Sequence, residues 1–255
     1  MIAGYRGFIT LCRKEIQRFL SVSVQTVFAP LVSTLLYLLI FGQVMPEGAS
    51  GFDTLSYHQF LLPGLIMMAM LQNAFSNSSS SLIQSKMYRN LDLLLLSPLS
   101  PLAIFLAFVV GAVVRGLMVG IAIAVVASFW VPMPVTHLAW VIVFALLTTM
   151  VLGALGFLAG LWADKYDKLA AFQNFVILPL TFLSGVFYSV AILPPVWQTA
   201  TWLNPFFYMV DGFRYGVLGV SDVSPWLSLA VTFGFMLVLS MVTVSLLARG
   251  WKTRR

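Results

Sequence analysis

Four polar side chains lie inside two consecutive apolar stretches. These residues are the best placed in the sequence to bind a polar group inside those stretches. Arg115 stands near the middle of one stretch, and Gln72, Asn73 and Asn77 stand in the stretch before it. An arginine at the centre of a membrane helix costs at least about 2.5–3.5 kcal/mol on insertion scales, so it needs a polar partner. Two interpretations remain open: a hydrogen-bond network between helices, or contact with an anionic or polar group of a substrate.

Residue counting brings these side chains to a similar depth. The two stretches run in opposite directions from a shared loop, and a helix rises about 1.5 Å per residue. Gln72 and Asn73 therefore reach about the level of Arg115, while Asn77 lies one turn nearer the loop. The segment 76–81 consists of serines except for Asn77. Its small hydroxyl side chains permit either close helix packing or a polar wall along a translocation path.

Residue types that carry covalent or metal chemistry are scarce and scattered. His58 and His137 fall in different predicted loops, and neither has a metal partner at ligand spacing. Cys12 is the single cysteine, which excludes an intramolecular disulfide and a multi-cysteine metal site. The nucleotide-binding pattern G-x-x-x-x-G-K-[ST] does not occur in the sequence. We therefore expect no catalytic residue, no metal site and no bound cofactor in this chain.

The composition places these residues in a membrane protein. Of the 255 residues, 60% are hydrophobic and 9% are charged, whereas a soluble domain carries about 25% charged residues. A membrane-spanning helix needs about 20 predominantly apolar residues. Six stretches meet this requirement, so the sequence predicts an all-α membrane protein with one transmembrane domain over 1–255. The six predicted spans cover 24–44, 60–82, 102–130, 138–162, 172–193 and 226–248.

The basic residues predict how the chain is oriented in the membrane. Twelve of the 14 Lys and Arg residues fall at the two ends of the chain or in the loops after the second and fourth spans. The opposite side holds one, Arg214, and the loop 45–59 has acidic residues but no Lys or Arg. Cytoplasmic segments carry the excess of Lys and Arg, so we expect both termini in the cytoplasm.

Three segments outside the spans have patterns of their own. Residues 2–20 have an apolar face that includes Tyr5 and Ile9, which predicts an interfacial amphipathic helix. The loop 86–98 begins charged, becomes apolar and stops at a Ser-Pro pair, so it is either a plug for a partner's groove or a helix connector. Residues 194–225 are rich in aromatic residues and proline, which predicts short re-entrant helices at the outer interface.

Two motifs resemble those of the type-2 ABC transporter permease family, and the resemblance covers essentially the whole chain. One motif is MYRNLDLLLLSPLS at 87–100, in which Asp92 stands where the family commonly has Glu. The other is LSGVFY at 183–188, followed by Leu-Pro-Pro, Leu-Asn-Pro and then Asp-Gly-Phe-Arg at 211–214. The closest resemblance is to small bacterial permeases that work with a separate ATPase subunit.

The resemblance implies a homodimer of six-span subunits in the bacterial inner membrane, with spans 1 and 5 near the dimer axis. It implies that 2–20 form a connecting helix at the interface, that 86–98 form a coupling helix, and that two copies of a separate ATPase bind ATP and Mg. The residues coupled to the ATPase would be Arg89, Asp92, Leu94, Leu95, Ser97 and Pro98. The motif of the outer re-entrant helices would comprise Ser184, Gly185, Asn204, Pro205, Asp211 and Arg214. The acidic and basic members of this motif stand three residues apart on a predicted helix and could form an ion pair.

These features favour the permease subunit of an exporter. Such a subunit is not catalytic; it forms a substrate path, contacts lipid and a second copy of itself, and leaves ATP hydrolysis to its partner. The alternative is an ion-coupled carrier or channel without an ATPase, which usually needs a carboxylate inside a span. A membrane enzyme would need convergent acids or histidines, and no nucleic-acid-binding motif accompanies the basic residues. The low charge of the spans favours an amphipathic or lipid-linked substrate such as a drug, lipid or polysaccharide.

Overall fold

The structure is a computed structural model that describes residues 2–44 and 55–251, and every regular element in these ranges is helical. This confirms the predicted all-α class. The first part contains α1 (Ile2–Leu20), α2 (Ser23–Val44), α3 (Tyr57–Met87), α4 (Asn90–Leu96), α5 (Pro101–Ala127) and α6 (Leu138–Trp162). The second part contains α7 (Tyr166–Phe172), the π-helix η1 (Gln173–Ile177), α8 (Leu178–Phe182), the 3-10 helix η2 (Val190–Ile192), α9 (Pro195–Trp202), α10 (Pro205–Leu218) and α11 (Pro225–Ala248).

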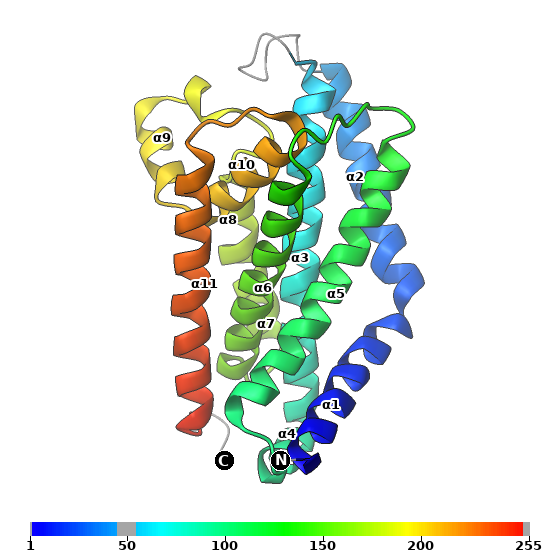
Figure 1. Cartoon of the computed structure of the whole chain (residues 1–255), viewed down its shortest axis with the longest axis vertical. Coiled ribbons are helices and arrows are strands. Elements are labelled where there is room, and N and C mark those ends of the chain that lie inside the picture. The colour runs from blue at the N-terminus through cyan, green and yellow to red at the C-terminus, as the bar shows by residue number, and fades with distance from the viewer. Residues whose placement is uncertain (1, 45–54, 252–255) are drawn as a thin grey trace.

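The long helices stand side by side in a bundle (Figure 1). α1 begins and α11 ends at the same end of this bundle, and the short helix α4 lies at that end too. α9 and α10 lie at the opposite end (Figure 1). α4 is predicted to contact a partner, and α9 and α10 are predicted to be re-entrant. These two groups of helices therefore lie at opposite ends of the bundle.

Four helices have the length and hydropathy of membrane spans, namely α2, α5, α6 and α11. α3 is longer, with 31 residues, but amides and serines between 72 and 81 make it less apolar. α7, η1 and α8 continue without a break over 166–182. The helix then ends well before the predicted boundary at 193, because the chain turns at Gly185, whose φ of 73° is a conformation that suits glycine. The count of six spans remains a prediction.

α3 lies at the centre of the bundle, where it packs against α5, α6 and α10. Its closest contacts with other segments are made at glycine residues. A Cβ atom at Gly156 of α6 would lie 2.4 Å from the backbone oxygen of Phe75, and one at Gly64 of α3 would lie 2.8 Å from the backbone oxygen of Val186. Glycine at these two positions therefore lets the backbones approach each other, as small residues do in other membrane bundles.

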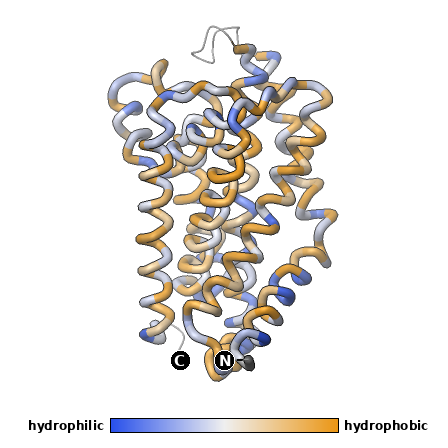
Figure 2. The backbone as a smooth tube through the Cα atoms, viewed as in Figure 1, coloured by the Kyte–Doolittle hydropathy of each residue, from blue (hydrophilic) through white to orange (hydrophobic). Residues whose placement is uncertain are grey.

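α2 and α11 lie at the periphery of the bundle. In the most apolar part of each helix, 11% and 22% of the residues are buried, compared with 50% in α5 and 56% in α6. Large apolar side chains such as Phe28 on α2 and Met241 on α11 are exposed. Figure 2 shows hydrophobic residues along the long helices and hydrophilic residues gathered on α1 and at helix ends. An exposed apolar surface of this kind suits contact with lipid or with another membrane protein.

α1 packs against α5 through a face that overlaps in part with its predicted apolar face. Phe19 of the predicted face is buried together with Leu11 and Glu15, at a spacing of four residues, and Phe8 and Cys12 pack partly against the core. Tyr5 and Ile9 of the predicted face are exposed, so this part of the face remains available for contact with lipid. The amphipathic pattern predicted the helix, but it did not predict that an acidic residue would lie on the buried side.

Candidate functional site

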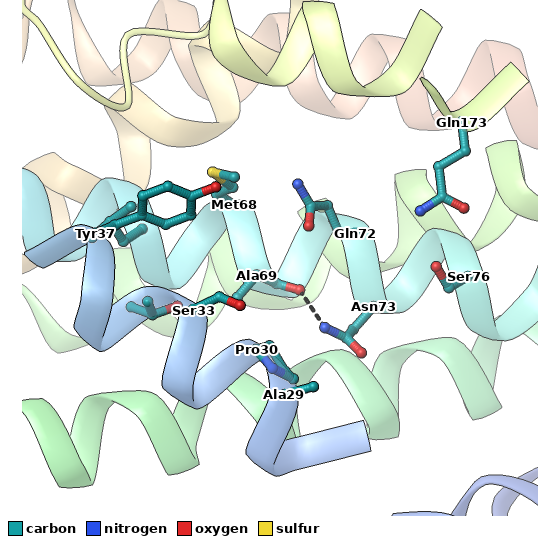
Figure 3. A pocket seen from close by; sticks show the side chains of 12 residues that line it. Ala29, Pro30, Ser33, Tyr37, Met68, Ala69, Gln72, Asn73, Ser76 and Gln173 are labelled. Atoms are coloured by element: carbon teal, nitrogen blue, oxygen red, sulfur yellow. Dashed lines mark hydrogen bonds between the residues drawn. The ribbon is translucent and has the colours of Figure 1, made fainter. Parts of the chain in front are cut away.

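A polar cavity of about 250 Å³ lies between α2, α3 and η1. Figure 3 shows its wall from close by, with Gln72 of α3 and Gln173 of η1 pointing into the same space. The polar residues of the wall are Ser33, Thr34, Tyr37, Gln72, Asn73, Ser76 and Gln173. Most of these side chains carry hydrogen-bond donors, so the wall can bind a polar group that enters it.

Two irregular helices shape this cavity. Pro30 lies inside α2 and lines the cavity; since proline has no amide proton, the carbonyl of Thr26 loses its helical hydrogen bond. On the other side, the π-helical turn of η1 carries Gln173 to the wall. Single π-turns inside α-helices are rare and occur frequently at functional sites. Gln173 was not among the predicted site residues, because no pattern in the sequence marks the π-turn.

Arg115 of α5 is hydrogen-bonded to the cavity wall through Asn73. Its Nε and Nη2 donate to Oδ1 of Asn73 at 3.3 Å and 3.2 Å. Asn73 in turn donates from Nδ2 to the carbonyl of Ala69 at 3.0 Å, as the dashed line in Figure 3 marks. The structure thus brings together the two residues that residue counting placed at one depth. Gln72 lies beside them in the wall.

A second arginine, Arg18 of α1, contacts α3 one turn away from Asn73. Its Nη2 donates to the carbonyl oxygen and to Oδ1 of Asn77 at 2.8 Å and 3.0 Å, and its Nη1 donates to Oγ of Ser80 at 3.4 Å. Glu15 is fully buried beside it, with Oε2 at 3.6 Å from Nε of Arg18. Burial lowers the pKa of Arg18, and the charge of Glu15 acts in the opposite direction.

Glu15 and Arg18 belong to the predicted interfacial helix 2–20, and neither was predicted to form a site. A signal was present: Glu15 has the same four-residue spacing from Leu11 and Phe19 as a buried stripe requires. Asn77, which was predicted to adjoin the intramembrane polar residues, therefore pairs with α1 rather than with Arg115.

The predicted coupling segment forms a distinct short helix, α4, at the end of the bundle where the described chain begins and ends (Figure 1). Leu91 packs inside, whereas Leu93 and Leu96 are 68% and 84% exposed. Leu94 and Leu95 are half-buried. The outward surface of this segment therefore includes Asp92, Leu93 and Leu96.

The ends of α4 have defined geometry. Arg89 precedes the helix in a left-handed conformation with φ of 58°, which is uncommon for a residue with a side chain. Ser97 follows the helix and donates from Oγ to the carbonyl of Leu94, and the exposed Pro98 comes next. These bounds agree with a helix that stops at the Ser-Pro pair.

The predicted outer motif gathers around the start of α10. Asn204 caps this helix, because its Oδ1 accepts a hydrogen bond from the amide of Phe206 at 3.0 Å, and its Nδ2 donates to the carbonyl of Leu180 at 2.7 Å. Pro205 occupies the first helical turn, where a missing amide proton does no harm. Ser184 donates from Oγ to the carbonyl of Thr181 at 2.6 Å. The contact of Asn204 with Leu180 joins the start of α10 to α8, and the bond of Ser184 closes the turn that follows α8.

Arg214 and Asp211 are both fully buried, but they do not form the ion pair that their spacing suggested. The ion pairs of other residues, such as Glu15–Arg18 and Asp164–Lys168, do not involve either side chain. Instead, Nη2 of Arg214 donates to the carbonyl of Gly185 at 2.6 Å, and its guanidinium lies 4.0 Å from the centre of the Phe60 ring.

Asp211 accepts hydrogen bonds from the loop that leads into α11. The amide of Asp222 donates to its Oδ1 at 2.7 Å, and Oγ of Ser228 donates to its Oδ2 at 3.3 Å. The side chain of Asp222 accepts from Ser189 and from the amide of Val190. The predicted pairing was wrong because backbone and hydroxyl donors of this loop reach the carboxylate of Asp211, and sequence spacing on one helix gives no information about them.

Comparison with known proteins adds the following similarities. The family model described as ABC-2 type transporter matches residues 6–218. The inner membrane transport permease YadH of Escherichia coli (strain K12) is 39% identical over 237 residues, which cover 93% of each chain. Nodulation protein J of Neorhizobium galegae is 24% identical over 97% of this chain and 95% of that protein. Nodulation protein J of Rhizobium meliloti (strain 1021) is 24% identical over 95% of this chain and 93% of that protein.

Proposed function

Because this chain belongs to the family of ABC-2 type transporters, we propose that it is the membrane subunit of an ATP-driven exporter whose ATPase is a separate chain. The observation that carries the proposal is the exposed apolar surface of α4 at the end of the bundle where the chain begins and ends. The sequence contains no nucleotide-binding loop, so ATP and Mg would be held by the partner. This chain would contribute the path and no covalent chemistry.

Six spans would cross the inner membrane in this proposal. They are α2, α3, α5, α6, the continuous segment α7–η1–α8, and α11. An even number of crossings is required for both ends of the described chain to lie on one side, as Figure 1 places them. The excess of Lys and Arg on that side favours the cytoplasm, which puts α4 within reach of a cytoplasmic ATPase. α9 and α10 would then dip into the outer interface.

The exposed leucines of α4 would bind two copies of the ATPase, one for each permease. A leucine that is fully buried in a partner's groove contributes about 1.5–3 kcal/mol. Leu93 and Leu96 together can therefore hold a partner, and the exposed carboxylate of Asp92 can orient it. Movement of the ATPases on ATP binding would reach the bundle through α3 and α5, which flank α4 in the chain.

A homodimer would complete the path. The surfaces of α2 and η1 that flank the cavity carry exposed aromatic side chains, among them Phe28 and Phe175, the latter 82% exposed. Exposed apolar patches of this kind mark interaction sites or lipid contacts. A second copy seated on α2 and η1 would close the cavity from outside. The mixed wall of amides, hydroxyls and apolar residues suits an amphipathic or lipid-linked substrate.

The test is recovery of the ATPase with the permease. Replacement of Leu93 and Leu96 by Glu should reduce recovery of the ATPase at least tenfold and should abolish ATP-dependent transport in proteoliposomes. The matched control is Leu203→Glu, which changes an equally exposed leucine at the opposite end of the bundle. Equal recovery in both variants would contradict the proposal. Transport that continues without any ATPase would instead favour an ion-coupled carrier or channel.

A further inference from the structure

Arg115 is a charged residue in the middle of a bundle helix, and it forms no ion pair with an acidic residue in the described part of the chain. Its two hydrogen bonds go to a neutral amide oxygen, that of Asn73. Ion pairs within the described ranges involve other residues, and Nη1 of Arg115 has no hydrogen-bond partner among residues 2–44 and 55–251. Charged side chains inside membrane helices normally pair with an opposite charge or line a substrate path.

The acidic side chain of Glu15 lies against Arg18, at 3.6 Å, and does not pair with Arg115. Two guanidinium groups contact neighbouring turns of α3, at Asn73 and at Asn77, and the positive charge of Arg18 lies close enough to act on Arg115. This leaves an excess positive charge beside the cavity, which favours the entry of an anion.

The cavity wall can complete an anion site. Arg115 itself does not line the cavity; it lies behind Asn73, which lines the cavity and accepts the hydrogen bonds of Arg115. Gln72, Ser76 and Gln173 present amide and hydroxyl donors to the same space (Figure 3). An arginine binds carboxylate or phosphate through two parallel hydrogen bonds, and such charge-assisted bonds are about twice as strong as neutral ones. The hydrogen-bond donors around the cavity therefore suit a tetrahedral phosphate or a planar carboxylate.

The volume limits what can bind. A space of about 250 Å³ is smaller than the pockets that hold drug-sized molecules, which are about 300–1,000 Å³. It accommodates a headgroup and leaves an alkyl chain outside, against the exposed apolar side chains of α2 and η1.

We propose that Arg115 binds the phosphate or carboxylate group of an amphipathic molecule whose headgroup occupies the cavity between α2, α3 and η1. This inference rests on the proposed function, because it names the chemical class of the transported molecule. The anionic group belongs either to that molecule or to a lipid of the bilayer, and both sources offer the same chemistry to Arg115.

Binding can be measured on the full chain alone, without the ATPase. The chain is purified in dodecyl maltoside and titrated with dodecyl phosphate while thermal unfolding is recorded. The comparison probes are inorganic phosphate, which lacks the alkyl chain, and dodecyl trimethylammonium, which has the opposite charge. We expect a saturable stabilisation by dodecyl phosphate, a weaker one by inorganic phosphate and none by the cation.

Two variants test the role of Arg115 in different ways. Arg115→Gln keeps donors toward Asn73 but removes the charge, and it should weaken the apparent affinity for dodecyl phosphate about tenfold or more. Asn73→Asp places a carboxylate where the amide oxygen accepts from Arg115. It should abolish binding of dodecyl phosphate while raising the unfolding temperature, because Arg115 then has an internal anion. This second variant keeps the proposal testable if the first folds poorly.

Arg249→Gln is the matched control, since it removes one positive charge from an exposed position at the end of α11. It should bind dodecyl phosphate as the wild-type chain does. Equal affinity in wild type and Arg115→Gln, or an equal loss in Arg115→Gln and Arg249→Gln, would overturn the proposal. Recovery of the ATPase by Arg115→Gln should be normal, so that this inference and the proposed function can fail separately.

Native mass spectrometry from nanodiscs distinguishes the two sources. If phosphatidylglycerol stays on the wild-type chain but is lost from Arg115→Gln and Asn73→Asp, the bound group belongs to a bilayer lipid. If no lipid is retained while dodecyl phosphate still binds through Arg115, the site serves the transported molecule. Retention of phosphatidylglycerol to the same extent by all three chains, together with unchanged binding of dodecyl phosphate, would contradict the proposal.

Discussion

α3 separates two regions of the bundle that surround a buried arginine in different ways. On the packed side, toward α6 and α10, Arg214 is fully buried between the carbonyl of Gly185 and the ring of Phe60. On the cavity side, toward α2 and η1, Arg115 is partly buried and bonded to Asn73 in the wall of an open space. The packed side encloses its arginine, although Nε and Nη1 of Arg214 have no hydrogen-bond partner among the described residues, and the cavity side leaves room for another molecule.

The surroundings of the two arginines suggest different roles. Arg214 lies in reach of the electrostatic attraction of Asp211 and Asp222, whereas the charge that acts on Arg115 is that of Arg18. Arg214 is enclosed by protein and leaves no room for a ligand, whereas Arg115 is partly exposed and bonded to a residue of the cavity wall. Burial of a charge inside a membrane protein is therefore not sufficient evidence of function, and the partners of the charge decide between the two roles.

The largest effect on folding is expected on the packed side. Arg214→Ala removes the hydrogen bond to Gly185 and the contact with Phe60, and the unsatisfied carbonyl and the lost cation–π contact together cost about 3 kcal/mol. The free energy of unfolding in micelles should fall accordingly, as should the folded yield. Arg249→Ala, at an exposed position, should change neither quantity. A folded yield of Arg214→Ala equal to wild type would show that the packed side does not depend on this arginine.

A second, smaller effect tests whether the packed side is as tight as its contacts indicate. A Cβ atom at Gly156 would lie 2.4 Å from the backbone of Phe75, so Gly156→Ala should lower the free energy of unfolding by about 1–3 kcal/mol. The matched control is Gly234→Ala on the peripheral helix α11, where no atom lies within 4 Å of the added methyl group. This control should be neutral or stabilising by up to about 1 kcal/mol, since alanine favours a helix. Equal unfolding temperatures of the two variants would contradict the difference between the regions.

Several features of the cavity side could be predicted from the sequence, because they depend on the spacing of residues along a single helix. Counting residues from a shared loop placed Arg115 level with Asn73, and the side chains of these residues are hydrogen-bonded. The apolar periodicity predicted α1, and the Ser-Pro stop predicted the end of α4. The functional roles of these residues remain predictions, since they concern partners and substrates outside this chain.

The remaining features depend on how separate segments meet, and sequence spacing does not report that. The π-turn that carries Gln173 to the cavity involves a one-residue change in helix geometry inside an ordinary apolar segment. The partner of Asp211 is a loop amide at Asp222 and not the arginine on its own helix. The burial of Glu15 became apparent only when α1 was packed against α5.

The smallest effect is expected at Glu15, which lies beside the cavity-side arginines. Its carboxylate is fully buried, lies 3.6 Å from Arg18, and accepts no hydrogen bond among the described residues. Removal of one partner from a buried ion pair usually destabilises a protein, because the other charge is left without compensation. Here the side chain of Arg18 is still 23% exposed to solvent, and the substitution also removes a buried carboxylate that accepts no hydrogen bond, so the two effects largely offset each other. Glu15→Gln should therefore change the free energy of unfolding by less than about 1 kcal/mol. Arg18 keeps its hydrogen bonds to Asn77 and Ser80 in this variant.

Glu15→Gln also tests the difference between the two sides of α3. Without the negative charge of Glu15, Arg18 and Arg115 raise the positive potential at the cavity, so dodecyl phosphate should bind severalfold more tightly. Thermal unfolding with and without dodecyl phosphate measures both quantities in one experiment. Weaker binding, or a large loss of stability, would mean that Glu15 serves the cavity-side arginines as an essential counter-ion. The cavity side would then resemble the packed side, where Asp211 and Asp222 attract the buried arginine without pairing with it, and Arg115 would have less need of an external anion.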